Sequence, residues 1–275
     1  MLNFATPIAV SMTLILVIVF MLSGFAATGQ TSTAASTIAD QSVVKRYFEQ
    51  ALVYPESALR QGLKGKVTIS MEVMPDGQTR DYRIERGIDA AMDAEALRLA
   101  RHILWKPATI LGNPVSSRGT IIIEFNPKAY LKKKRDIPHI VDYQNTESIF
   151  EPDPIYSLRQ LSEAPKVNLP AGFGTVGAYI AHLMKYPEMA AKNNISGNVM
   201  LDFVIETNGI ASNISIRESV GGGCDQEAIR ILEQLRWTPG KKSGLDVRTR
   251  ADIEIVFRLN EHQQRSVPNQ RNTGL

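Results

Sequence analysis

Apolar residues recur along this chain with two periods, and the same succession of periods appears in both halves. From Ser42 the apolar positions lie three or four residues apart, which predicts a helix with one buried face. Pro55 ends this helix, because the residue before a proline is pushed out of the helical region. From Gly65 apolar and polar positions alternate, which predicts a strand. The buried helix face holds Val44, Tyr47, Phe48 and Leu52, and the inward strand face holds Val67, Ile69, Met71 and Val73.

Three further elements complete this unit. The Pro75-Asp76-Gly77 segment predicts a hairpin turn, since glycine readily adopts a positive φ. We expect a second helix to begin at Asp93 as its N-cap, because a short carboxylate accepts hydrogen bonds from free backbone amides. This helix ends near Trp105-Lys106-Pro107, and a last strand follows. The predicted inward residues are Tyr82 and Ile84 on the second strand, Ala96, Leu97, Ala100 and Ile103 on the helix, and Ile121, Ile123 and Phe125 on the last strand.

The unit occurs twice, and the two copies align without a gap. Each position from Ser42 to Phe125 has a partner between Gly174 and Phe257, and roughly a quarter of these pairs are identical. The identities fall on glycines, prolines, aromatic residues and predicted core positions, as expected of a duplicated fold. In the second copy the two inward strand faces hold Val199, Leu201, Phe203 and Ile205, then Ile214 and Ile216, and the expected N-cap is Asp225.

The predicted fold class is α+β, with two copies of a small helix-strand-strand-helix-strand domain behind an N-terminal hydrophobic helix. A right-handed crossover from strand two to strand three places strand one at the centre and strand three at an edge of a three-stranded antiparallel sheet. Residues 155–161 are expected to form a short helix. We assign 1–29 to a signal peptide or transmembrane anchor, 30–41 to a short spacer, 42–127 to domain 1, 128–173 to a linker, 174–260 to domain 2, and 261–275 to a mobile tail.

The N-terminal segment indicates export. Ile8 to Ala27 is almost wholly apolar, and no charged side chain occurs before Asp40. About 20 apolar residues suffice to span a bilayer as a helix. The small residues that follow also suit a secretory signal cleaved before Ala27 or before Gln30. A retained anchor and a cleaved signal both remain open.

Composition and motifs argue against several function classes. The chain is 44% hydrophobic and 21% charged, as in an ordinary folded protein, and its net charge of +3 does not favour nucleic acid. The basic run Lys132 to Arg135 suits a solvated linker. The four histidines lack metal-ligand spacing, and no hydrolase or phosphate-loop motif occurs. We expect no enzyme activity, catalytic residue, cofactor or metal. Cys224 is expected to be inert and partly buried, with a reactive thiol as the alternative.

The ordered set of motifs resembles one family in both copies. The set comprises Tyr54-Pro55-Glu56-x-Ala58, Gly65-x-Val67, Gly77, Asp93-x-Glu95-Ala96 and Trp105-x-Pro107, together with their partners in the second copy. It resembles the TonB C-terminal domain, over residues 42–127 and 174–259. The resemblance implies a protein of the Gram-negative cell envelope that faces the periplasm. It implies TonB-dependent outer-membrane transporters as partners, and inner-membrane proton-channel motor proteins if the anchor is retained.

The resemblance also implies where the partner binds. Family members take up an extended transporter segment as an added strand at a sheet edge, which offers free backbone hydrogen-bonding groups. By position, the edges here are residues 118–125 and 250–257. The candidate partner-binding residues are Arg118, Thr120, Ile122 and Glu124 in the first copy, and Arg250, Asp252, Glu254, Ile255, Val256 and Phe257 in the second. The alternative is a soluble periplasmic or secreted adaptor that binds peptides without motor coupling.

Two features depart from the family pattern. Family transducers usually carry a long proline-rich spacer, whereas here about 15 residues separate the apolar segment from Ser42, which span at most roughly 50 Å when extended. Their membrane segment commonly holds a histidine, which this apolar segment lacks.

Overall fold

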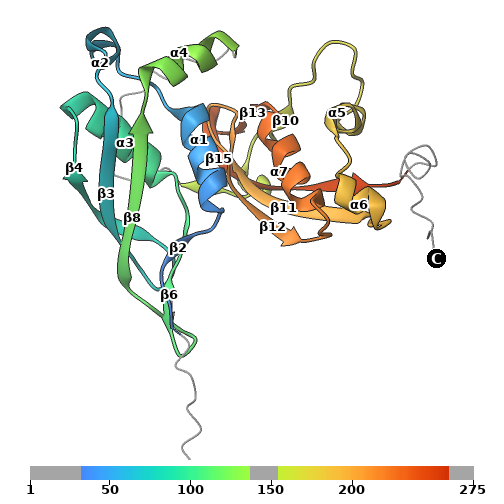
Figure 1. Cartoon of the computed structure of the whole chain (residues 1–275), viewed down its shortest axis with the longest axis horizontal. Helices are drawn as coiled ribbons and strands as arrows, with labels where there is room; N and C mark the ends of the chain where they lie inside the picture. Colours follow the sequence, from blue (N-terminus) through green and yellow to red (C-terminus); the bar gives the residue numbers. More distant parts are fainter. Residues whose placement is uncertain (1–31, 137–153, 260–275) are drawn as a thin grey trace, which may run out of the picture. The chain divides into compact units, whose positions relative to one another are not determined.

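A computed structural model describes residues 32–136 and 154–259 of the chain (Figure 1). The expected N-terminal hydrophobic helix, the C-terminal tail and part of the linker lie outside the described residues. Within the two described ranges, no helix has the length and apolar character needed to cross a membrane.

The first repeat forms the predicted three-stranded antiparallel sheet, in the order β4-β3-β8. Strand one of the pattern is central and strand three lies at an edge, as predicted from the crossover. Helix α3 contacts all three strands (Figure 1). The main elements are α1 (Gln41–Ala51), α2 (Glu56–Gln61), β3 (Gly65–Val73), β4 (Thr79–Arg86), α3 (Ala90–Arg101) and β8 (Ser117–Phe125).

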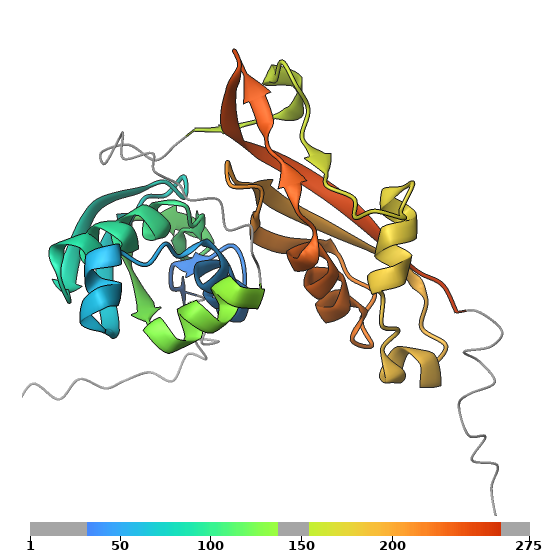
Figure 2. The same ribbon diagram turned by 90° about the horizontal axis from the view of Figure 1, so that it is seen from above.

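The second repeat has the same order of elements and the same central strand. Its sheet runs β12-β11-β15-β14, and β9 (Ile155–Tyr156) also pairs with β15, so two short strands extend the sheet beyond the predicted three. The hairpin of β14 and β15 projects past the rest of this sheet (Figure 2). The elements are α5 (Val176–Leu183), α6 (Glu188–Lys192), β11 (Gly197–Ile205), β12 (Ala211–Glu218), α7 (Cys224–Gln234), β14 (Gly240–Lys242) and β15 (Leu245–Phe257).

Short strands outside the predicted pattern complete each repeat. The segment before α1 pairs with the strands that follow α3, and residues 166–167 pair in the same way with residues 237–238. Part of the expected spacer is therefore built into the first repeat. The strands are β1 (Ser32–Thr33), β2 (Ser36–Thr37), β5 (Trp105–Lys106), β6 (Ala108–Ile110), β7 (Asn113–Val115), β10 (Lys166–Val167) and β13 (Trp237–Thr238). Helix α4 (Pro127–Asp136) follows β8 directly.

The short helix expected over residues 155–161 is only partly present. Ile155–Tyr156 forms strand β9, which pairs in parallel with Arg248 and Thr249 of β15. Only Leu158–Gln160 is helical, as a 3-10 turn with a capping box between Ser157 and Gln160. The outer edge of β15 recruits the first residues of this segment into a strand, which local spacing does not reveal.

The cores contain the residues that period-two alternation predicted. All eight inward residues of β3 and β11 are at most 2% exposed. The second strand is less well covered, because it forms the other edge of each sheet. Ile84 and Ile216, both expected to point inward, are each 38% exposed, so that part of the prediction was wrong.

Asp93 and Asp225 do not cap their helices. Asp89 caps α3 by accepting from the Met92 amide at 2.8 Å, and Gly223 precedes α7 without a side-chain cap. Asp93 and Asp225 instead lie in the first helical turn and accept from the backbone amides of Ile88 and Val220 in the preceding loop. Their role is to fix the loop that enters the helix.

A second acidic residue of each helix ties it to the first helix of its repeat. Glu95 accepts from the Val53 amide at 2.7 Å, and Arg98 bonds both Glu95 and the Ala51 carbonyl. Glu227 and Arg230 repeat this arrangement with Lys185 and Leu183. Both glutamates therefore have structural partners in the fold.

Candidate partner-binding edges

Strand β8 has one strand neighbour among the described residues, which is β3. The two strands pair without a register shift from Gly65 opposite Phe125 to Val73 opposite Ser117. Buried and exposed side chains alternate along β8, so one face covers the core and the other meets solvent. The backbone groups on the outer side of β8 are free to pair with a further strand.

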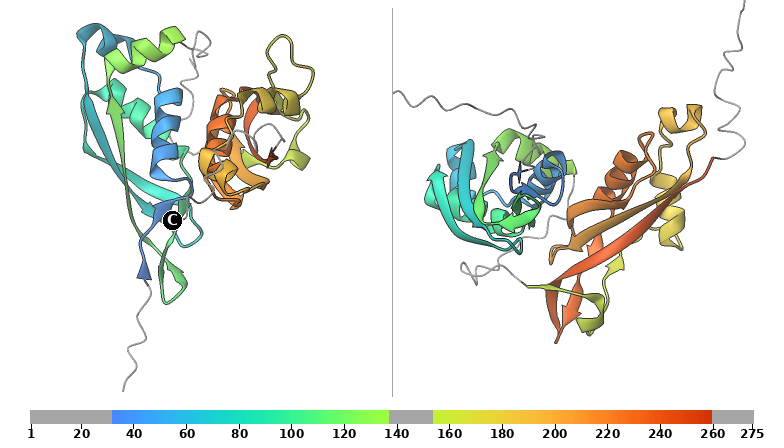
Figure 3. Two further views of the ribbon diagram at one scale, coloured as in Figure 1. Left: turned by 45° about the vertical axis from the view of Figure 1, so that its right-hand side comes forward. Right: turned by 90° about the horizontal axis from the view of Figure 1, so that it is seen from below.

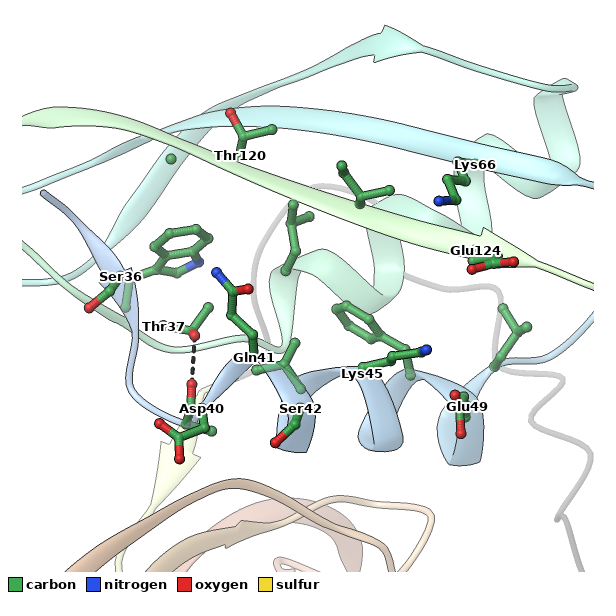
Figure 4. Close-up of a pocket in the computed structure, with 18 of the residues that line it drawn as sticks. Ser36, Thr37, Asp40, Gln41, Ser42, Lys45, Glu49, Lys66, Thr120 and Glu124 are labelled. Carbon is green, nitrogen blue, oxygen red and sulfur yellow. Dashed lines mark hydrogen bonds between the residues drawn. The ribbon is translucent and has the colours of Figure 1, made fainter.

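A groove lies along this free edge. Its volume is about 1290 Å³, and it is lined by β8, α1, α4 and the segment 35–40. Figure 4 shows β8 passing over α1, with Thr120 and Glu124 on the strand and Gln41, Lys45 and Glu49 on the helix. An extended segment added to β8 would lie between the strand and this helix.

The groove wall carries more positive than negative charge. Five basic and three acidic side chains line it: Lys45, Lys66, Lys106, Arg118 and Lys133, against Asp40, Glu49 and Glu124. Lys133 of α4 lies 3.7 Å from Glu49 of α1, an ion pair that joins the two helices along one side of the groove. Burial lowers the pKa of Lys133, and Glu49 opposes this effect. The excess of cations favours a ligand with acidic residues.

Trp105 supplies an unused hydrogen-bond donor beside the groove. Its side chain lines the groove and is 6% exposed, and its indole N–H has no acceptor among the described residues. The ring packs closely against β8, since a side chain at Gly119 would approach it to 3.1 Å. A buried donor without a partner is costly, so an acceptor from a ligand would be favourable here.

The second edge is partly occupied by the protein itself. On the outer side of β15, β14 pairs with residues 245–247 and β9 pairs with residues 248–249 (Figure 3). From Arg250 to Phe257 the outer side has no strand neighbour among the described residues. Asp252 and Glu254 lie on the exposed sheet face, where Arg217 and Asn198 bind them at 3.1 Å and 2.5 Å.

The predicted residues thus fall into two groups. Arg118, Thr120, Ile122 and Glu124 all line the groove, and Ile122 is 55% exposed. In the second repeat, Ile255 and Phe257 are fully buried, so only their backbone could meet a partner. Arg250, Asp252 and Glu254 are exposed, and Val256 is half-buried.

Sequence reasoning missed the opposite wall of the groove. Gln41, Lys45 and Glu49 recur at every fourth position on α1, which marks them only as a polar helix face. Nothing in that spacing shows that the face lies beside a sheet edge. Trp105 was identified as the end of a helix, and its free N–H depends on three-dimensional packing.

Comparison with known proteins gives one family. Residues 50–127 and 183–259 each match the family model described as Gram-negative bacterial TonB protein C-terminal, which together is more than half of the chain. Each match ends at or just beyond the edge strand of its repeat. No curated protein matches the chain.

Proposed function

Because this chain belongs to the family of Gram-negative bacterial TonB protein C-terminal domains, we propose that it binds outer-membrane transporters by strand addition. The chain is a TonB-type envelope protein with two such domains. The domains of this family are protein-interaction modules without enzymatic chemistry. In this proposal an extended periplasmic segment of the transporter pairs with β8. The free part of β15, residues 250–257, is a second and shorter binding edge. Inner-membrane proton-motive energy is then transmitted to the transporter through the bound chain.

The observation that supports this proposal most directly is the free outer edge of β8 facing the groove. A strand bound there gains backbone hydrogen bonds on one side and side-chain contacts with α1 on the other. The excess of basic side chains fits a segment that carries acidic residues. Specificity would come from Ile122 and the charged residues, since backbone pairing is common to all sequences.

Backbone methylation of the ligand tests strand addition. The probe is a short synthetic peptide from the periplasmic N-terminus of a TonB-dependent transporter of the same bacterium. In an added strand, the N–H groups of alternate residues point toward the neighbouring strand. We expect N-methylation of one alternate set to abolish binding, and N-methylation of the other set to leave the affinity within about twofold. Fluorescence anisotropy with the full chain measures both.

Equal effects of the two methylated sets would contradict strand addition, because the peptide would then not pair as a strand. A peptide of the same composition in scrambled order is the control for charge attraction alone. Its binding at roughly 500 mM salt should be lost, since surface electrostatics is strongly screened at that ionic strength.

The N-terminal segment decides between a transducer and an adaptor. A soluble adaptor with the same two edges is the second candidate, favoured by the small residues that follow the apolar stretch. We expect an intact N-terminus in the inner-membrane fraction of the host. A mature chain that begins near Ala27 or Gln30 and appears in the soluble periplasmic fraction would exclude energy transduction and leave the adaptor.

A further inference from the structure

A buried polar cluster joins the two repeats. Glu206 and Arg248 of the second repeat are 1% and 2% exposed and form an ion pair with Nε–Oε2 and Nη2–Oε1 distances of 2.8 Å and 2.9 Å. Arg248 also donates to the carbonyl of His102, the C-cap residue of α3 in the first repeat. The His102 ring lies 3.2 Å from Glu206. Burial alone would raise the pKa of Glu206, but Arg248 and His102 hold it well below its usual range.

Asn213 completes the cluster. Its side chain accepts from the Leu104 amide at 2.7 Å and donates to the His102 carbonyl at 2.8 Å. It therefore satisfies two backbone groups that follow the end of α3. Asn213 adopts a positive φ of 51°, which asparagine tolerates better than most residues. The side chain is thus held toward the first repeat by the bulged backbone of β12.

The cluster is not inherited from the duplication. At the equivalent positions of the gapless alignment, the first repeat has Met74, Asp81 and Ser116 in place of Glu206, Asn213 and Arg248. The second repeat has Gln234 where the first has His102. The two copies have diverged in complementary ways, so this surface of the second repeat fits the first repeat and not another copy of itself.

Helix α1 has one face toward this junction and another toward the groove. Arg46 binds Glu233 of α7 at 2.7 Å, and the Tyr47 hydroxyl lies 3.0 Å from Nδ1 of His102. Lys45 and Glu49 line the groove (Figure 4). An isolated helix as short as α1 is marginal in water, so its position depends on its tertiary contacts.

We propose that the second repeat acts as a support that fixes α1 and so sets the affinity of the β8 groove for an extended peptide. This inference rests on the proposed function of that groove. When the repeats are docked, the groove wall is held in place before the peptide arrives. When they separate, α1 has to become ordered as the peptide binds. The free-energy cost of this ordering reduces the affinity.

The Asn213→Gly variant tests the proposal in the full chain. Glycine keeps the positive φ and removes both hydrogen bonds to the first repeat. The matched control is Asp81→Gly, which changes the equivalent bulge of the first repeat, where the side chain is exposed. The distance between spin labels at Asp76→Cys and Glu218→Cys reports docking, and anisotropy of the transporter peptide reports the groove.

We expect Asn213→Gly to broaden the distance distribution and to weaken peptide binding roughly tenfold, with Asp81→Gly unchanged in both. Arg46→Ala, on the α1 surface, should weaken binding by a smaller factor without unfolding either repeat. A broadened distance distribution with unchanged peptide affinity would overturn the proposal that the second repeat fixes α1. An unbroadened distribution in both variants would overturn the assignment of docking to these contacts. A wild-type chain with a narrow distribution that binds no peptide would instead overturn the proposed function.

Discussion

At the scale of single residues, the indole N–H of Trp105 is a candidate donor to a bound peptide, because it has no acceptor among the described residues and Trp105 lines the groove. Trp105→Phe keeps an aromatic ring but removes the donor together with the outer part of the indole, whose Cη2 faces Gly119. If a peptide oxygen accepts from this N–H, the variant should bind about fivefold more weakly, as expected for one hydrogen bond. Its thermal stability should fall modestly, because the smaller ring leaves a cavity in the core, and Trp237→Phe should show a similar loss.

The equivalent tryptophan is the control for this prediction. Trp237 in the second repeat also has a buried N–H without an acceptor among the described residues. Trp237→Phe should leave peptide binding at the β8 groove unchanged. Equal affinity for wild type and Trp105→Phe in the same titration would show that the ligand does not use this donor.

Glu206 makes the stability of the chain sensitive to acid. Its folded-state pKa lies below the unfolded value, because Arg248 and His102 lie against it, with Arg98 and Tyr47 also nearby. Its contribution is therefore complete above about pH 4.3 and is lost as the pH falls toward the folded-state pKa. Glu206→Gln breaks a buried ion pair and should cost about 3–5 kcal/mol at pH 7.

Urea unfolding at pH 7 and pH 3 measures the free energy of unfolding and so tests whether the stabilisation by Glu206 decreases in acid. The difference between wild type and Glu206→Gln should shrink at pH 3, because the wild-type advantage has begun to disappear. Glu218→Gln, at an exposed position, should show no difference at either pH. If the difference in free energy of unfolding between wild type and Glu206→Gln stayed constant over this pH range, the Glu206 carboxylate would not provide the stabilisation.

At the scale of elements, the two edge strands share a fold position but differ in sequence. Ile122 of β8 is replaced by Glu254 at the equivalent position of β15, so the fold tolerates glutamate there. Ile122→Glu should therefore preserve stability. It should weaken peptide binding about tenfold, through lost apolar burial and repulsion of an acidic ligand. The reverse change, Glu254→Ile, should leave binding at the first groove unaltered, and loss of folding in Ile122→Glu would contradict the equivalence.

The sequence predicted the main elements of this fold well and their connections less well. The alternation in β3 and β11 identified the central strands because both are buried on one face and paired on both sides. Ile84 and Ile216 were placed wrongly because an edge strand is only half covered, although its pattern is the same. The true cap of α3, Asp89, lies one helical turn before Asp93, and both are plausible from local chemistry.

The candidate site shows the same division between local and long-range information. The edge residues of β8 followed from strand order, which the crossover rule determines. The groove wall on α1 and the pairing of β9 with β15 depend on contacts between segments distant in sequence, and no local period encodes them. No sequence pattern singled out Asn213, although its side chain binds the other repeat.

At the scale of the whole described molecule, the two repeats are not independent domains joined only by a flexible linker. Their junction is polar and specific, with three hydrogen bonds to main-chain groups of residues 102–104 and the Arg46–Glu233 ion pair. A linker calculation would allow the second repeat to lie up to about 150 Å away. The buried Glu206–Arg248 pair opposes such separation, because undocking would remove its contacts with His102.

This coupling predicts how the chain unfolds. Differential scanning calorimetry of the full chain should give one cooperative transition, since unfolding either repeat removes the partners of buried groups in the other. Asn213→Gly should broaden this transition toward two, because two of the three hydrogen bonds to residues 102–104 are lost and the coupling is weaker, whereas Asp81→Gly should not. The ratio of calorimetric to van't Hoff enthalpy distinguishes the two cases: near one for a single unit, and near two for independent repeats of similar size. A ratio near two in the wild type would mean that the junction is too weak to couple the repeats, and the support of α1 by the second repeat would fail with it.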